Sequence, residues 1–144
     1  MRKLISIIAL SAASVSVAYA DQLVFSADKA GGARAAAIDY VSNGDAVAFE
    51  FRINVPGGEA ASVNLKSCVA SLPKSHAGQC SFAKGQVIGI VYSDTNERLP
   101  KGIISVGKIS VQSKVEGDLS VASFTSVNRE GVSIESNVAG SAAK

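Results

Sequence analysis

The chain has 144 residues, 47% of them hydrophobic, with 14 Lys and Arg against 12 Asp and Glu. Arg2 and Lys3 account for the whole excess of positive charge, and no basic cluster remains to mark a phosphate-binding surface, which makes nucleic acid a poor candidate partner. Val and Ile are frequent, Ser and Gly separate them, and only three Pro occur, a composition typical of strands joined by tight turns.

The first twenty residues have the three-part pattern of a secretory signal peptide. Two basic residues begin the segment, an apolar run follows over residues 4–10, and Ala18 and Ala20 place small side chains at the two positions that a signal peptidase recognises. Serines interrupt the run before it reaches the roughly 20 apolar residues that a membrane span requires. We therefore expect cleavage before Asp21, a mature protein in the periplasm or outside the cell, and no membrane span.

Residues 21–139 are of ordinary single-domain length, and their first predicted elements are strands at 23–25 and 34–41. Asn43-Gly44 follows the second of these strands, and this dipeptide suits the positive-φ positions of a type I′ turn. The sequence therefore predicts a β-hairpin that joins 34–41 to a third strand at 47–55.

The strand at 47–55 has the clearest pattern in the chain. Large apolar residues occupy every second position, so the strand should direct one apolar row, which includes Phe51, into a core. The alternate row carries Glu50 and Arg52 and must then face away from that core. Only this second row is accessible from outside.

The middle of the chain is less regular. Short strands are expected at 63–69 and 79–83, and the segment 56–78 between the regular parts is expected to hold a short helical turn. Residues 87–92 are mostly apolar, which is typical of a strand that is covered on both faces.

Three more strands complete the domain. At 102–112 the apolar row changes phase, which a bulge near Gly107 would explain. Strands at 120–127 and 132–138 follow, and the small and polar residues 140–144 should fray. About eight or nine short strands separated by turn signals, with no apolar 3.6-residue period, predict an all-β sandwich.

Cys68 and Cys80, the only cysteines in the chain, both lie after the predicted cleavage site. Export would place them where disulfides form and persist, and a bridge across so short a loop contributes about 3 kcal/mol by restricting the unfolded chain. With a single histidine in the protein, a Cys/His metal site would have to recruit carboxylates. We expect a Cys68–Cys80 disulfide and no metal or other cofactor, with two free buried thiols as the alternative.

The residue types that support catalysis are scattered. His76 stands alone in a polar, turn-like segment, without a Gly-x-Ser-x-Gly motif, and is predicted to be a solvated loop residue. The carboxylates Asp39, Asp45 and Glu50 show no pairing suited to glycoside hydrolysis, and the chain has no Trp to form a sugar-binding platform. We therefore expect no enzymatic activity.

Residues 93–97, with the sequence Ser-Asp-Thr-Asn-Glu, place several oxygen-bearing side chains in one loop, which a calcium ion could use. The spacing of an EF-hand is absent, and a hydrogen-bonded turn between two strands accounts for the same residues. The sequence is compatible both with calcium binding by the loop from Asp94 to Glu97 and with a hydrogen-bonded turn.

Taken in chain order, these segments resemble the cohesin modules of cellulosomal scaffoldins. Residues 23–26 resemble the first strand of that family, and residues 35–56, AAAIDYVSNGDAVAFEFRINVP, resemble its second strand, turn and third strand. Residues 87–111, VIGIVYSDTNERLPKGIISVGKISV, resemble its apolar strand, acidic turn, Gly-Ile restart and following long strand. The cysteine pair and the region from Lys66 to Lys84 differ from typical scaffoldin cohesins.

The resemblance implies a jelly-roll-type antiparallel β-sandwich of about eight or nine strands that binds another protein through a sheet face, without identifying a dockerin as the partner. In cohesins the strand that corresponds to 47–55 contributes to that face, which makes Glu50 and Arg52 the candidate partner-binding residues. A solvated face with a weak charge pair is the alternative for these two side chains. A carbohydrate-binding module that takes polysaccharide, and a structural or adhesin-type envelope subunit, are the alternative functions.

Overall fold

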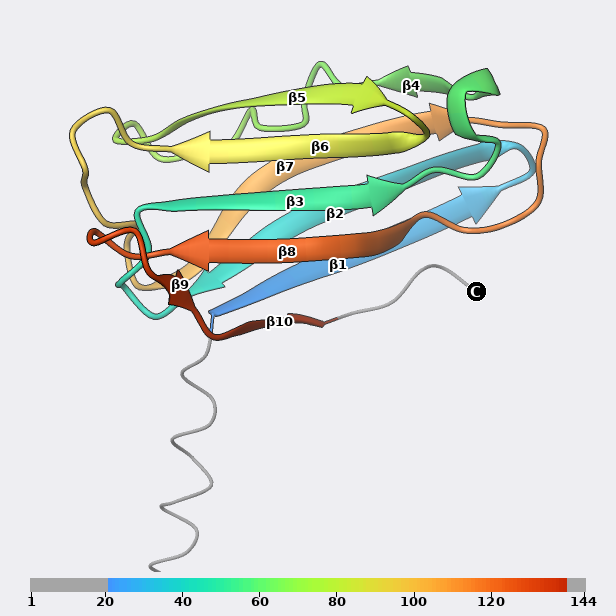
Figure 1. Cartoon of the computed structure of the whole chain (residues 1–144). Coiled ribbons are helices and arrows are strands. Elements are labelled where there is room, and N and C mark those ends of the chain that lie inside the picture. Colours follow the sequence, from blue (N-terminus) through green and yellow to red (C-terminus); the bar gives the residue numbers. More distant parts are fainter. Residues whose placement is uncertain (1–20, 140–144) are drawn as a thin grey trace, which may run out of the picture.

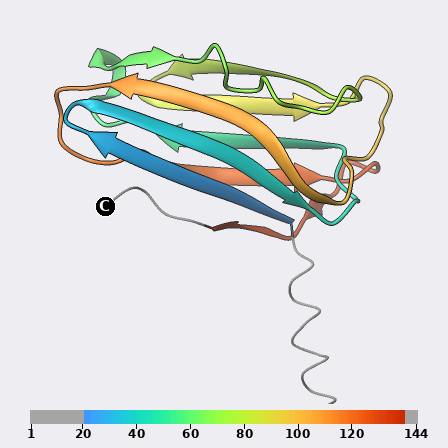
Figure 2. The ribbon, with the colours of Figure 1, turned by 180° about the vertical axis from the view of Figure 1, so that it is seen from behind.

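The computed structural model describes residues 21–139, which form two five-stranded sheets stacked face to face (Figures 1 and 2). Sheet A has the order β10 (Ser136–Ala139), β1 (Asp21–Ala30), β2 (Ala33–Ser42), β7 (Gly102–Gln112) and β4 (Ser62–Asn64). Sheet B has the order β5 (Ala77–Ala83), β6 (Gln86–Tyr92), β3 (Ala48–Asn54), β8 (Ser120–Val127) and β9 (Ser133–Ile134). Within these residues every strand pair is antiparallel except β1 with β10. The expected all-β sandwich is confirmed, with ten strands in place of eight or nine.

The segments predicted as a signal peptide, 1–20, and as a frayed tail, 140–144, lie outside the described residues. β1 begins at Asp21, the residue that follows the predicted cleavage site. Between residues 21 and 139, no helix is long and apolar enough to cross a lipid bilayer.

The inward rows of the strands form the core between the two sheets. Phe49, Phe51 and Ile53 of β3 are at most 3% exposed, as the alternation predicted. Tyr40 of β2 stacks on Phe49 with ring centroids 4.5 Å apart, so an aromatic pair joins the two sheets. Phe51 packs over Gly89 on the neighbouring strand, and a Cβ at that glycine would lie 2.1 Å from the Phe51 ring. Only glycine leaves room for the ring at this position.

The predicted hairpin between 34–41 and 47–55 is wrong. β2 pairs with β1 and β7 in sheet A, whereas β3 pairs with β6 and β8 in sheet B. Residues 43–47 cross from one sheet to the other, and Gly44 has the positive φ, 93°, that the Asn-Gly dipeptide suggested. Asn43 does not share this positive φ, so the predicted type I′ turn is absent and the chain only bends at Gly44. The two strands pack their apolar rows against each other across the core instead of forming hydrogen bonds side by side.

β7 contains the predicted bulge. Its register with β2 shifts at Val106, which is the extra residue beside Gly107. The Val106 carbonyl accepts a hydrogen bond from the Ser71 N–H at 3.1 Å, and a Cβ at Gly107 would lie 2.2 Å from the carbonyl oxygens of Ser67 and Cys68. The bulge and its glycine therefore let the β4–β5 connection dock closely against sheet A.

A disulfide between Cys68 and Cys80 holds the same connection, and their Cα atoms are 6.4 Å apart. Cys68 is fully buried and Cys80 lies on β5, so the expected bridge is present and ties the docked loop to sheet B. The strand expected at 63–69 is reduced to the three residues of β4. The expected short helical turn is the 3₁₀ turn at Gly58–Ala60.

Both ends of the described chain depart from the predicted strands. The strand expected at 132–138 is divided, because β9 pairs with β8 in sheet B and β10 pairs with β1 in sheet A, so the chain changes sheets at Glu135. β1 extends well beyond the expected 23–25 and ends at Ala30, and the φ of 64° at the following Gly31 lets the chain turn back into β2. Small and polar residues fill this extension, and they carry no hydrophobic alternation from which a strand could be predicted.

Replacing both Cys68 and Cys80 with Ala should lower the free energy of unfolding by about 2–4 kcal/mol, because the bridge restricts the unfolded chain. Urea denaturation of the oxidised parent and of the double variant measures this difference. Thiol labelling of the undenatured parent should give no reaction until a reductant is added. Two reactive thiols in the natively oxidised protein would contradict the bridge.

Candidate binding face

The outward row of β3 belongs to the exposed face of sheet B. The strand register places Gln79, Ile90, Glu50 and Thr125 in one row across four strands. We define the sheet B face by the outward residues of these strands: Gln79, Ser81, Ile88, Ile90, Tyr92, Ala48, Glu50, Arg52, Ser123, Thr125 and Val127.

β6 supplies an apolar strip to this face. Ile90 and Tyr92 are 40% and 38% exposed, and Ile88 is half-buried in the same row. The expectation that this strand is covered on both faces is therefore wrong, because only the alternate row, centred on Gly89, faces the core. A shallow pocket of about 260 Å³ hollows the face between β6 and β8.

Glu50 and Arg52 lie on β3 directly beside this apolar strip. Arg52 Nη2 donates a hydrogen bond to Glu50 Oε2 at 3.1 Å, and the side chains of Arg52 and Glu50 are 44% and 40% exposed. Glu50 is opposite Ile90 and Arg52 is opposite Ile88, so both stand on the outward row to which the alternation assigned them. An exposed pair of this kind contributes at most about 1 kcal/mol to folding, so its removal should leave the fold intact.

Mostly uncharged side chains of β8 and β5 lie on either side of the strip and the ion pair. β8 contributes Ser123, Thr125 and Val127, and β5 contributes Gln79 and Ser81. A partner surface can therefore contact the apolar strip and the ion pair at the same time. An apolar centre within polar surroundings is the usual arrangement of a protein–protein interface.

His76 is buried, contrary to the expectation of a solvated loop residue. It is 8% exposed, its Nε2–H donates to the Val47 carbonyl at 3.2 Å, and its Nδ1 accepts from the Ser75 hydroxyl at 2.8 Å. Nε2 carries the proton because a carbonyl can only accept. Burial lowers the pKa of His76. A carbonyl and a hydroxyl thus occupy the two ring nitrogens, and the ring holds the loop before β5 against the start of β3 instead of facing a catalytic carboxylate.

The loop at 93–97 is closed by its own hydrogen bonds. Ser93 Oγ accepts from the backbone N–H groups of Thr95 at 3.3 Å and Glu97 at 3.0 Å, and the Thr95 hydroxyl donates to the Glu97 carboxylate at 2.9 Å. In the part of the chain that the structure describes, no group of three or more His, Cys, Asp or Glu side chains is arranged to hold a metal ion. The turn accounts for the polar side chains of this loop.

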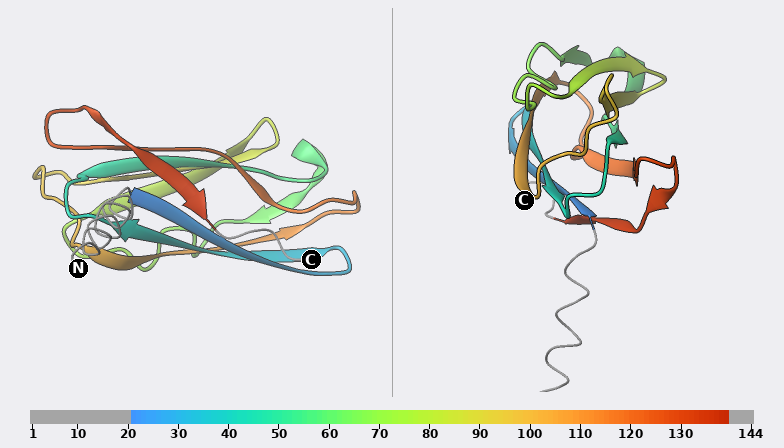
Figure 3. Two further views of the ribbon diagram at one scale, coloured as in Figure 1. Left: turned by 90° about the horizontal axis from the view of Figure 1, so that it is seen from below. Right: turned by 90° about the vertical axis from the view of Figure 1, so that its left-hand side faces the viewer.

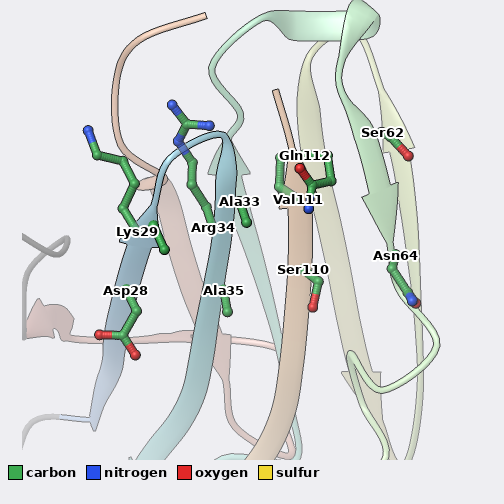
Figure 4. Close-up of a pocket in the computed structure, with 11 residues that line it drawn as sticks. Asp28, Lys29, Ala33, Arg34, Ala35, Ser62, Asn64, Ser110, Val111 and Gln112 are labelled. Atoms are coloured by element: carbon green, nitrogen blue, oxygen red, sulfur yellow. The ribbon is translucent and has the colours of Figure 1, made fainter. Parts of the chain in front are cut away.

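The outer face of sheet A has a second shallow pocket, of about 530 Å³ (Figure 4). Ala35 of β2 and Ser110 of β7 lie on its floor, and Asp28 and Asn64 stand on opposite sides of it (Figure 4). Its lining residues include no aromatic side chain able to stack on a sugar ring. This surface therefore offers little support for the carbohydrate-binding alternative.

Arg34 borders that pocket, but its guanidinium group already donates hydrogen bonds to backbone carbonyls. Its Nε donates to the Gly117 carbonyl at 2.6 Å, its Nη2 to the Val115 carbonyl at 2.7 Å, and its Nη1 to the Gly32 carbonyl at 3.1 Å. The side chain is 4% exposed and its guanidinium N–H groups bind backbone carbonyls of the β7–β8 connection, so Arg34 holds that connection in place.

The order of the strands and the crossings between the two layers define a jelly-roll-type β-sandwich (Figure 3). Comparison with solved structures narrows this class to the cohesin fold. The third ScaC cohesin of Acetivibrio cellulolyticus, solved in complex with the ScaB dockerin, is similar over 85% of this chain and 95% of that chain, with a TM-score of 0.60 and 14% identity. The cohesin module of a family 33 glycoside hydrolase from Clostridium perfringens gives a TM-score of 0.60 at 13% identity, over 85% and 98% of the two chains. A non-cellulosomal cohesin from Archaeoglobus fulgidus gives 0.57 at 10% identity, over 84% and 88%.

No family model matches the sequence, and no curated protein matches it. The similarity to solved structures therefore establishes the fold: the chain has a cohesin-like sandwich, as the resemblance of residues 35–56 and 87–111 implied.

Protein stability should decrease as the pH falls below about 6.5, because the buried His76 binds a proton less readily in the folded state than in the unfolded state. Since the folded pKa is the lower one, the contribution of His76 is complete above the unfolded pKa and is lost as the pH falls toward the folded pKa. Denaturant midpoints at about pH 8 and about pH 5 measure this loss. His76→Gln is the matched control, because its amide can donate to the Val47 carbonyl but does not titrate. The variant should show a smaller loss, and an equal loss in both proteins would assign the effect to other groups.

Proposed function

We propose that this protein is an exported, non-catalytic module that binds another protein through the sheet B face. The observation that carries the proposal is the exposed pair Ile90 and Tyr92, held on a sheet beside the ion pair of Glu50 and Arg52. The fold supports it, because the similar ScaC cohesin was solved with a dockerin and another similar cohesin of the same organism was solved in a cohesin–X-dockerin complex.

The apolar strip supplies the binding energy in this proposal. Tyrosine is one of the residues that dominate interface energies, because its ring buries a large area while its hydroxyl keeps a hydrogen-bond partner. Ile90 lies in the same row of β6 and extends this apolar area. Both side chains project from a paired strand, so little ordering of the backbone opposes binding.

The ion pair supplies orientation. Glu50 and Arg52 present one charge of each sign beside the strip, and charges at such positions affect the association rate and the choice of partner more than the affinity. The partner that this face fits is a folded protein with an apolar patch bordered by charges of both signs. Dockerins are the partners named for the similar cohesins, and they are the first class to test.

The non-catalytic part of the proposal rests on the structural roles that His76, the residue considered for catalysis, and two other polar side chains have in the fold. His76 holds two chain segments together, and Arg34 binds backbone carbonyls. The carboxylate of Glu97 closes a turn. Each of these groups is occupied by the fold, and a binding role needs none of them.

Export is proposed from the first twenty residues of the sequence. One observation supports it: a disulfide suits an oxidising compartment. Mass spectrometry of protein recovered from the periplasm or the medium should therefore find Asp21 at the N-terminus. Recovery of exported protein that retains Met1 would overturn the signal assignment.

Replacing Ile90 with Thr and Tyr92 with Ala together should weaken binding of the native partner at least tenfold, or about 1.4 kcal/mol. Glu50→Ala with Arg52→Ala should weaken it by about tenfold, mainly by slowing association. Both double variants should stay within about 1 kcal/mol of the parent in stability, since all four side chains are on the outward row. Quantitative capture from native envelope or culture fractions, followed by kinetic binding measurements on the partner so identified, provides the comparison.

Ile103→Thr is the matched control, because Ile103 is 78% exposed on the outer face of sheet A. This variant should bind like the parent. A loss of binding in Ile103→Thr, with none in the sheet B variants, would move the site to sheet A. A specific signal on a glycan array, without any protein partner, would favour the carbohydrate-binding alternative.

A further inference from the structure

Asp21 is a fully buried carboxylate at the first position of β1. Its Oδ1 accepts a hydrogen bond from the Asn43 backbone N–H at 2.9 Å, and its Oδ2 accepts from the hydroxyl groups of Tyr40 and Ser126. These donors come from β2, from the crossing that follows β2, and from β8, so one carboxylate connects both sheets at this end of the sandwich.

The donors around this carboxylate are all neutral. Burial, together with the hydrogen bond to Asp21, raises the pKa of Tyr40, so its hydroxyl remains protonated and donates.

The charged groups on the adjoining segments are of both signs. Asp45 and Glu135 are acidic, Lys101 packs beside Gly44 of the crossing after β2, and Arg129 after β8 donates its Nε–H to the Asn96 carbonyl. Neither of these two basic residues forms an ion pair with Asp21.

The nearest basic residues along β1 and β2 are at the far ends of these strands. Lys29 forms an ion pair with Asp118 at 3.4 Å, and Arg34 binds the carbonyls of the β7–β8 connection. Among residues 21–139, no basic side chain forms an ion pair with Asp21. Hydrogen bonds satisfy the oxygens, but a buried carboxylate without a cation is costly.

We propose that cleavage of the chain before Asp21 supplies the missing cation, because the new α-ammonium group of Asp21 pairs with its own buried carboxylate. A signal peptidase would add water across the Ala20–Asp21 peptide bond, with the hydroxyl joining the Ala20 carbonyl carbon and the proton joining the Asp21 nitrogen. The resulting amine has a reference pKa of about 7.7–8.0 and binds a further proton at neutral pH. Its nitrogen and the carboxylate belong to one residue and lie close together in the folded and the unfolded chain alike. Their attraction is stronger in the folded chain, because the carboxylate is fully buried there and water screens it less.

The consequence is that processing and folding stability are linked. In the uncleaved chain the Asp21 nitrogen is a neutral amide, and among residues 21–139 the buried carboxylate has only neutral hydrogen-bond partners. In the cleaved chain the ammonium lies beside the carboxylate that contacts Tyr40 of sheet A and Ser126 of sheet B, so its attraction stabilises the junction of both sheets. The inference rests on the export proposal for the origin of the free amine, whereas the stability effect is a property of the chain that begins at Asp21.

The test compares residues 21–144 with a free Asp21 amine against the same protein acetylated at the α-nitrogen, which restores a neutral amide like that of the uncleaved chain. At about pH 6 the free amine should raise the folding equilibrium constant by about tenfold. An ion pair raises the amine pKa in the folded state, so the advantage should be complete below the unfolded value and fall to less than about twofold by pH 10. Urea denaturation at each pH measures it, and the lysines cancel because both proteins share them.

Asp21→Asn is the matched background, because its amide keeps the size of the side chain and removes the charge. Acetylation of this variant should change the equilibrium constant by less than about twofold at either pH. An equal effect of acetylation in both backgrounds, or no effect on the parent at pH 6, would overturn the inference. Should Asp21→Asn fail to fold, the pH series on the parent decides alone. Exported protein that begins at another residue would refute cleavage before Asp21, and with it the origin of the free amine, while leaving this stability result intact.

Discussion

The stacking of Tyr40 on Phe49 is the contact on which the rest of the structure depends. Tyr40 belongs to sheet A and Phe49 to sheet B, so their 4.5 Å ring separation sets how closely the two layers approach. The hydroxyl of the same tyrosine donates to Asp21 and fixes the first residue of β1. Because Phe49 faces the core and successive side chains of a strand point to opposite faces, Glu50 points outward, where it lies opposite Ile90 of β6.

The alternation of apolar and polar residues predicted which side chains of a strand face the core. It did not predict which strands pair with each other. The pattern at 47–55 was sufficient to assign Phe51 inward and Glu50 outward, and a change of phase near Gly107 was sufficient to predict a bulge. An Asn-Gly turn, in contrast, is compatible both with a hairpin and with a crossing between sheets. The choice is made by the packing of the two apolar rows against each other, which no local pattern reports.

The sequence predicted the outward position of Glu50 and Arg52 on the sheet B face. It did not predict the apolar strip of β6 beside them. The run at 87–92 has the same appearance whether one or both of its faces are covered, because periodicity carries no information when both rows are apolar. Gly89 is the signal that could have corrected the assignment, since a glycine within a strand indicates a large neighbour, here Phe51, on that side. His76 was misplaced for another reason: its burial comes from the packing of a polar loop against β3, which local polarity conceals.

The contact between Gly107 and the β4–β5 connection restricts how this sequence can diverge. Any side chain at position 107 would meet the backbone of Ser67 and Cys68, so a chain that keeps the disulfide and its docked loop must also keep the glycine. A chain that lost Cys80 and released the loop would be free to accept a larger residue there. A chain that keeps the two cysteines is thus expected to keep a glycine at position 107, a three-position signature that would separate relatives of this protein from cohesins that share only the general sandwich.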